Sequence, residues 1–196
     1  MHGIFRAGTI RRKSRTAGFT IVELLIVIVV IGILAAITIA TYNGIQARAE
    51  NTKTIQAVSQ YVKGLHSYAV LNDGYPVDVS FPCLGPFPDT KCGRVGTTVA
   101  NCLGTGGAVA SRSSFDTKMK QVFSGTMPTP STQSMSCSGS TFGGAYYYAA
   151  TAKSAGITYF LRGDQSCGGV GGVASLTRAQ QEDLTRCVAT LPTTVP

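Results

Sequence analysis

The first part of the chain contains an unbroken run of apolar residues. No charged residue occurs from Leu24 to Ala47, and the seventeen residues Leu24–Ala40 are apolar apart from Thr38. With Phe19–Val22 added, the run reaches about 20 residues, the length of a helix that crosses a membrane. Because it is apolar on every side, it cannot be one face of a soluble helix. It must pack against lipid or against copies of itself.

The pattern then predicts an amphipathic continuation of the same helix. Small or apolar residues recur every three or four positions, at Ile45, Ala49, Thr52, Ile55, Val58, Val62, Leu65 and Ala69. The first helix-breaking cluster is Asn72–Pro76, and no proline precedes it. We therefore expect one helix from Phe19 to Leu71, with one stripe of its second half packed on a folded domain. His66 is expected to be an ordinary helix residue.

The region from Pro76 onward is rich in Gly, Ser and Thr and predicts short elements. A short amphipathic helix is expected from the spacing of Phe115, Met119, Val122 and Phe123. The segments Ala145–Thr151 and Ile157–Arg162 read as strands of an antiparallel hairpin, in which Tyr147 points opposite to its neighbours. Thr177–Gln180 resembles a capping box, so it predicts a last helix with four inward-facing residues. These are Leu184, Cys187, Val188 and Leu191.

This order of elements indicates an α+β fold. A long N-terminal helix, hydrophobic in its first half and amphipathic in its second, would pack on a small head domain with an antiparallel sheet. The head would occupy residues 76–196, and the amphipathic half of the helix residues 45–75.

Composition and charge exclude several classes of function. The net charge of +8 comes largely from five basic residues in the first 18 positions. They are Arg6, Arg11, Arg12, Lys13 and Arg15. The remainder holds twelve basic and nine acidic residues, so a broad basic face for nucleic acid is not indicated. Two histidines offer little for catalysis, and no nucleophile, phosphate-loop, zinc-protease or EF-hand motif appears. We expect no enzyme activity, no cofactor and no metal site.

The basic cluster predicts the orientation of the apolar segment. It holds the preceding end in the cytoplasm and places everything after Tyr42 outside. Hydropathy alone leaves three interpretations open. The segment can be a signal peptide cut near Thr38–Ala40, a plain single-pass anchor, or a helix that is kept after its basic leader is removed.

Glu23 stands at the head of the apolar run, where a charge is costly in a bilayer. One interpretation places its carboxylate in the first helical turn, where the helix dipole and headgroup water accommodate it. The other gives the carboxylate a cationic partner.

The segment Thr16–Leu25 resembles the processing site of type IV prepilins and the related pseudopilins. The family pattern is a basic leader ending in Gly, then Phe, Glu at the fifth mature position, and an apolar helix. Gly18, Phe19 and Glu23 match each position, and the match continues through Ile26–Ile37. The resemblance implies the pilin fold for the chain.

The resemblance also implies the chemistry of these residues. A prepilin peptidase would cut between Gly18 and Phe19 and methylate the new amine of Phe19. Residues 1–18 would then be a discarded leader, and residues 19–44 the transmembrane helix that becomes the filament core. In filaments of this family, Glu23 would face the N-terminal amine of an adjacent subunit. Pairing of Phe19 and Glu23 within one chain, four positions apart, is the simpler alternative.

Six cysteines all lie in the head: Cys83, Cys92, Cys102, Cys137, Cys167 and Cys187. An even number confined to the exported part predicts up to three disulfides, with fifteen possible full pairings. Reduced buried thiols are the alternative, and zinc is a poor explanation because the head and helix hold one histidine. Asp164, beside the glycine-rich Gly168–Gly172, is a weak candidate for a calcium site such as some pseudopilins have.

The function that the resemblance implies is that of a type IV pilus subunit. The chain would be a single-pass cytoplasmic-membrane protein before assembly and a homopolymeric cell-surface filament afterwards. Its partners would be the prepilin peptidase, the pilus assembly machinery and copies of itself, and the filament would serve adhesion, twitching motility or DNA uptake. Nucleic acid would be a partner only through the assembled pilus. A pseudopilin of a type II secretion system, or a membrane-anchored extracytoplasmic binding domain, are the alternatives.

Overall fold

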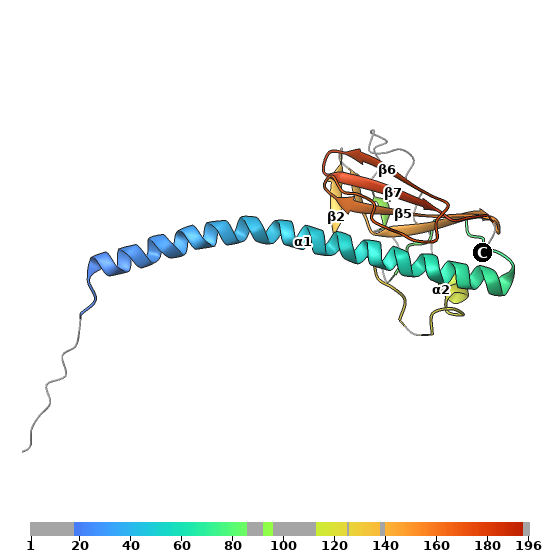
Figure 1. Ribbon diagram of the computed structural model, residues 1–196, viewed down its shortest axis with the longest axis horizontal. Helices are drawn as coiled ribbons and strands as arrows, with labels where there is room; N and C mark the ends of the chain where they lie inside the picture. The colour runs from blue at the N-terminus through green and yellow to red at the C-terminus, as the bar shows by residue number, and fades with distance from the viewer. Residues whose placement is uncertain (1–17, 86–91, 96–112, 125, 138–139, 194–196) are drawn as a thin grey trace, which may run out of the picture. The chain divides into compact units, whose positions relative to one another are not determined.

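A computed structural model describes residues 18–85, 92–95, 113–124, 126–137 and 140–193 (Figure 1). The helices in these residues are α1 (Ile21–Asn72) and α2 (Ser113–Met119). The strands are β1 (Gly93–Val95), β2 (Ser134–Cys137), β3 (Ser140–Gly143), β4 (Ala145–Thr151), β5 (Ser154–Arg162), β6 (Ser175–Gln181) and β7 (Leu184–Thr190). By internal contacts the chain separates into two units, Met1–Asn43 and Gly44–Pro196. The expected α+β fold, a long helix followed by an antiparallel sheet domain, is confirmed.

The predicted long helix is present and ends one residue after Leu71, at Asn72. Asp73 and Gly74 follow with positive φ angles of 54° and 147°. A Cβ on Gly74 would lie 2.7 Å from the Cβ of Ala152, so the turn needs glycine for both conformation and space. This turn directs the chain from the helix into the head.

The buried face of α1 begins later than the pattern predicts. Four of the predicted positions are at most 2% exposed, namely Val58, Val62, Leu65 and Ala69. Ile45, Ala49 and Thr52 are exposed instead, and the buried face starts at Asn51 and includes Thr54. The prediction of the first part of the stripe is therefore wrong, because polar side chains rather than apolar ones dock this end of the helix.

Asn51 and Thr54 attach α1 to the head through hydrogen bonds to its backbone. The Asn51 side-chain amide donates to the Arg162 carbonyl, and the Arg162 N–H donates to Asn51 Oδ1, both over 2.9 Å. Thr54 Oγ1 accepts from the N–H of Ser131 over 3.1 Å. These bonds satisfy buried backbone groups that hydrophobic contacts could not.

The four-stranded sheet has the order β4-β5-β7-β6, with every neighbouring pair antiparallel. The predicted hairpin is present as β4 and β5, and Tyr147 pairs with Ile157 across it. Tyr147 is fully buried, whereas Tyr148 is 37% exposed, as the alternation predicts. The Tyr147 hydroxyl donates to the Pro76 carbonyl over 3.0 Å, and burial together with the nearby Asp78 carboxylate raises the pKa of Tyr147 well above its usual range.

The predicted last helix is wrong. Thr177–Gln180 lies in β6, and the residues expected to face inward from a helix lie on or just after β7. Cys187 and Leu191 are buried on the face of the sheet that meets α1, while Leu184 is buried on the opposite face. A strand buried on both faces shows no simple alternation, and short apolar runs of this kind do not distinguish strand from helix.

Apolar cores lie on both faces of this sheet. One joins the sheet to α1 and α2 and contains fully buried Tyr61, Leu65, Phe115 and Tyr159. The other lies between the four-stranded sheet and the three-stranded sheet β1-β3-β2, around Phe142 and Phe160. Figure 1 shows the four-stranded sheet lying along the second half of α1. The predicted short helix is present as α2, whose Phe115 and Met119 are fully buried. It ends at Met119, earlier than predicted, so Val122 and Phe123 pack against the core from the turn that follows it.

Candidate functional site

The predicted processing residues lie just before α1 begins. Gly18 and Phe19 precede the helix in non-helical, exposed backbone, and the Phe19 side chain is 77% exposed. Glu23 lies in the first turn of α1, four residues beyond Phe19. The peptide bond between Gly18 and Phe19 thus lies in exposed backbone outside the helix, which is compatible with the predicted cleavage after Gly18.

The start of α1 is held by a reciprocal cap that the sequence reasoning missed. Glu23 Oε2 accepts hydrogen bonds from the Thr20 backbone N–H over 2.8 Å and from the Thr20 hydroxyl over 2.7 Å. The Glu23 N–H donates to Thr20 Oγ1 over 3.2 Å. This is the capping box, whose signal in the sequence is Thr followed three positions later by Glu. In a single chain, Glu23 therefore has a local role at the N-terminus of its own helix.

The first half of α1 exposes nearly all of its apolar surface. The large apolar side chains from Ile21 to Ile39 are between 48% and 84% exposed. The most apolar 18-residue window has a mean hydropathy of 3.0, and none of it is buried. By length and composition this helix can cross a membrane, a property that signal sequences share.

The head contains disulfides at the predicted cysteines. Cys83 is bonded to Cys92 and Cys167 to Cys187, each with a Cα–Cα distance of 5.6 Å. Cys137 is also disulfide-bonded, and none of the described cysteines is a free thiol. Cys102 lies outside the described residues. The Cys167–Cys187 bond ties the segment between β5 and β6 to the face of the sheet that meets α1.

The structure does not favour a calcium site at Asp164. Its carboxylate forms an ion pair with Arg178, whose Nε also donates to the Gln165 carbonyl over 2.7 Å. Within the described residues, no group of three His, Cys, Asp or Glu side chains could hold a metal ion. The acidic side chain therefore links the segment after β5 to Arg178 in β6.

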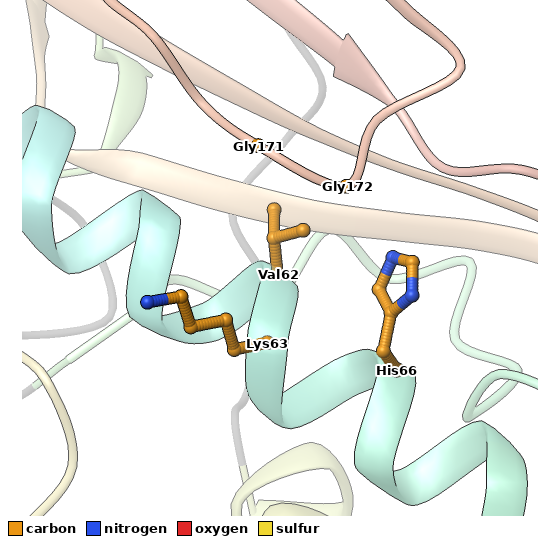
Figure 2. Close-up of a pocket in the computed structure, with 5 residues that line it drawn as sticks. All are labelled: Val62, Lys63, His66, Gly171 and Gly172. Atoms are coloured by element: carbon orange, nitrogen blue, oxygen red, sulfur yellow. The ribbon is translucent and has the colours of Figure 1, made fainter. Parts of the chain in front are cut away.

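His66, to which the sequence analysis gave no role, lines a cavity of about 330 Å³ (Figure 2). Val62 and Lys63 from the same helix and Gly171 and Gly172 from the β5–β6 connection form the rest of its lining. His66 Nε2 is buried without a hydrogen-bond partner in the described structure. No sequence signal indicates this cavity, because its two walls are about 100 residues apart in the chain.

Comparison with known families addresses the N-terminal motif directly. The family model for the prokaryotic N-terminal methylation motif matches residues 13–39. The chain resembles type IV pilins and pseudopilins. The match covers the predicted cleavage position, Glu23 and the apolar run, so the resemblance expected from the sequence is confirmed for this segment.

Curated relatives of both kinds are similar to the chain. The type IV major fimbrial protein FimA of Dichelobacter nodosus is 33% identical over 99 residues, which cover 50% of this chain and 52% of that protein. The type II secretion system core protein G of Aeromonas hydrophila is 32% identical over 65 residues, covering 33% and 46%. The core protein G of Escherichia coli K12 is 30% identical over 83 residues, covering 39% and 57%.

The chain spans about half the length of the curated relatives it matches. None of these three is named as an enzyme, which agrees with the expectation of a structural protein. No solved structure matches the chain.

Proposed function

We propose that this protein is a structural subunit of a type IV pilus. The observation that carries the proposal is the contrast within α1: a first half whose apolar surface is exposed along its length, joined to a second half packed on a disulfide-bonded head. A prepilin peptidase would cleave between Gly18 and Phe19 and methylate the Phe19 amine. Copies would then leave the membrane by packing their apolar helices together.

The environment of Glu23 supports assembly through this helix. After cleavage, the Phe19 amine carries a positive charge one residue before the Thr20 cap. A carboxylate and an ammonium among apolar helices are expected to form an ion pair, because an unpaired charge in that environment has a high free-energy cost. The intersubunit pair would set the register of neighbouring helices, while the Thr20 bonds would orient the carboxylate before assembly.

The alternative is a pseudopilin of a type II secretion system, which the similarity to core protein G favours. The fimbrial alignment extends over 99 residues, so it must include residues beyond the 52-residue helix α1. This longer similarity supports the pilus subunit as the first choice. Surface attachment, twitching motility or DNA uptake would be functions of the filament, driven by assembly machinery in the membrane and cytoplasm.

The basic leader and the disulfides support an orientation in the membrane. Basic residues favour the cytoplasmic side, and disulfides form in oxidising compartments outside it. The leader would therefore be cytoplasmic and the head extracytoplasmic, with the cell surface reached only after assembly.

Negative-stain microscopy of sheared surface fibres, with peptide identification, tests the proposal. Long fibres containing this chain are expected. Fibres absent outside the cell, with the protein retained in the envelope, would favour the pseudopilin, and a purely monomeric detergent extract would favour the anchored binding domain.

N-terminal sequencing of the mature protein tests the processing step. The expected first residue is N-methylated Phe19. A mature chain that begins near Tyr42 would show that the apolar helix is an ordinary signal peptide, and it would overturn both filament hypotheses.

A further inference from the structure

The connection between β5 and β6, residues 163–174, lies against one side of the packed half of α1. We call this connection the strap. A Cβ on Gly168 would lie 2.8 Å from Ile55 Cγ2, so the strap approaches the helix there with glycine backbone alone. A Cβ on Gly172 would lie 3.5 Å from His66 Nε2, and Figure 2 shows the strap passing over the helix at this point. The strap therefore covers one side of α1 from Ile55 to His66, about three helical turns.

The middle of the strap has few interactions of its own. Four of the six residues from 168 to 173 are glycine, and Val170 is the one buried side chain among them. Within the described structure, the one hydrogen bond of these six residues is local, from the Val170 N–H to the Gly168 carbonyl over 3.2 Å. Glycine loses more conformational freedom on ordering than any other residue. The closed position of this glycine-rich segment therefore depends on an anchor beside it.

That anchor is the disulfide of Cys167, the residue directly before the glycine-rich segment. Its partner Cys187 lies in β7 and is fully buried on the face of the sheet that meets α1. The Cys167 carbonyl also accepts a hydrogen bond from the hydroxyl of Tyr159, which is fully buried on the same face. The disulfide therefore fixes the start of the glycine-rich segment to the face on which α1 packs.

The ends of the strap are held by hydrogen bonds that do not involve the disulfide. The Gln165 N–H donates to Thr185 Oγ1 over 3.1 Å. At the other end, the Ala174 N–H donates to the Thr190 carbonyl over 2.8 Å. Breaking the disulfide should consequently release the middle of the strap and leave the strands on either side in place.

The helix also has attachments that the strap does not provide. Asn51 is hydrogen-bonded to the backbone of Arg162 in β5. The Tyr61 hydroxyl accepts a hydrogen bond from the Gly85 N–H over 2.9 Å. Opening of the strap would therefore uncover one side of α1 without detaching the helix from the head, which makes the strap a unit that opens locally.

We propose that the Cys167–Cys187 disulfide is a redox latch that closes the strap over α1. In the oxidised chain the strap covers the helix from Ile55 to His66. In the reduced chain the glycine-rich segment leaves the helix while the sheet stays folded. Closing the latch converts two thiols into one disulfide, and the two protons and two electrons pass to a disulfide-containing oxidant, which is reduced to two thiols.

The latch adds an order of events to the proposed function. Disulfides persist in oxidising compartments and are rare in the cytoplasm. In the proposed extracytoplasmic orientation, the strap closes only after the head has crossed the membrane. This order rests on the proposed orientation, whereas the latch itself is a property of the head and is tested without fibres.

Limited proteolysis of the full chain in detergent tests the latch. Thermolysin cuts before large apolar residues, so an open strap offers it the bonds before Val170 and Val173. In a variant with Cys167→Ser and Cys187→Ser, cleavage at these two bonds should be about tenfold faster, because cleavage follows the population of the open form. Amide hydrogen exchange in β5 and β7 should stay unchanged, since the sheet remains folded.

The matched control is a variant with Cys83→Ser and Cys92→Ser, whose bond lies in the core on the opposite face of the sheet. It should leave the rate of cleavage in the strap unchanged. Equal cleavage rates in the Cys167 and Cys187 variant and the unaltered chain would overturn the latch, because the strap would then be held by its other contacts. Cleavage spread through β4 and β5 would overturn it as well, because the bond would then stabilise the whole head.

A pair of glycine substitutions tests the same closure with both cysteines present. Gly168→Ala places a Cβ 2.8 Å from Ile55 Cγ2 at a φ of +71°, so it should hold the strap open. Because closure and bond formation are linked, the equilibrium constant for forming the disulfide with oxidised glutathione should fall about tenfold. Gly169→Ala, whose Cβ meets nothing within 4 Å, is the control and should not lower this constant. An equal fall in both variants, or no fall in either, would show that the strap and the bond are not coupled.

Discussion

The two halves of α1 share one backbone conformation and have opposite surroundings. From Ile21 to Asn43 the large apolar side chains are exposed, whereas in the second half Val58, Tyr61 and Leu65 are at most 1% exposed. The second half meets a sheet of its own chain. The large apolar side chains of the first half are not buried in the described structure, so we expect lipid or other copies to cover them.

The difference in burial between the two halves shows that a helical hydrogen-bond pattern does not determine what surrounds the helix. In both halves the backbone N–H and C=O groups are hydrogen-bonded within the helix. One helix can therefore lie in an apolar environment over its first half and against a folded domain over its second half. The stability of the second half comes from tertiary packing, and that of the first half from its surroundings. Substitutions in the two halves should therefore act on different properties, assembly in the first and folding in the second.

Glu23→Ala should have the largest effect, the loss of fibres with processing and membrane insertion intact. The physical reason is the unmatched Phe19 ammonium that the variant leaves among apolar helices. Fibre yield and N-terminal sequencing measure the two parts. Thr20→Ala is the matched control, because it removes the hydroxyl of the cap but keeps the carboxylate. Similar fibre loss in both variants would mean that Glu23 acts through the cap and not through a neighbouring subunit.

Leu65→Ala should destabilise the head by about 2–5 kcal/mol, because Leu65 is fully buried and its truncation leaves a cavity. Leu34→Ala, in the first half at 59% exposure, should change the free energy of unfolding by less than about 0.5 kcal/mol. Urea unfolding of the detergent-solubilised full chain, followed by tyrosine fluorescence, measures both. Equal effects of the two substitutions would contradict the division of the helix.

Replacing Cys167 and Cys187 together by serine should cost about 3 kcal/mol, since the bond closes a separation of 20 residues. The same double change at Cys83 and Cys92, 9 residues apart, should cost about 2.5 kcal/mol. Urea midpoints measure the difference, and the helical signal of the first half should stay unchanged in both variants.

Mass spectrometry without reduction checks the third bond. Because the other four cysteines pair with each other, Cys102 is the expected partner of Cys137. A free thiol at Cys102 would show that Cys137 is bonded to another copy.

Gly64→Ala and Gly44→Ala make the finest test, because the same change should have opposite signs. A Cβ on Gly64 would lie 2.5 Å from Phe123 Cζ, so the variant should lose about 1–3 kcal/mol by overpacking. A Cβ on Gly44 meets nothing within 4 Å, so the higher helix propensity of alanine should add up to about 1 kcal/mol. Thermal unfolding in detergent distinguishes the two, and destabilisation by both would mean that Gly44 is also a packing position.

The sequence predicted features that depend on near neighbours along the chain. The apolar run, the end of the helix near Leu71, the β4–β5 hairpin and α2 each follow from a local pattern. The Thr20–Glu23 cap was equally readable, since its residues are three apart. The processing residues Gly18, Phe19 and Glu23 belong to the same local motif.

Other features depended on contacts between distant segments. Thr177–Gln180 has a helical capping pattern, but pairing with β7 makes it a strand. Asn51 replaces the predicted apolar stripe because its partner, Arg162, lies 111 positions away. Local propensity is weaker than the sum of such tertiary contacts.

The amino-acid order alone determined that this protein has an apolar helix with a processing motif and a head rich in cysteine. The tertiary structure decided which cysteines pair and which face of α1 is buried. It also brought His66 and Gly172 together at one pocket. The reason is physical. A helix is closed by hydrogen bonds four residues apart, whereas a disulfide, a core and a pocket are made by residues that only folding brings together.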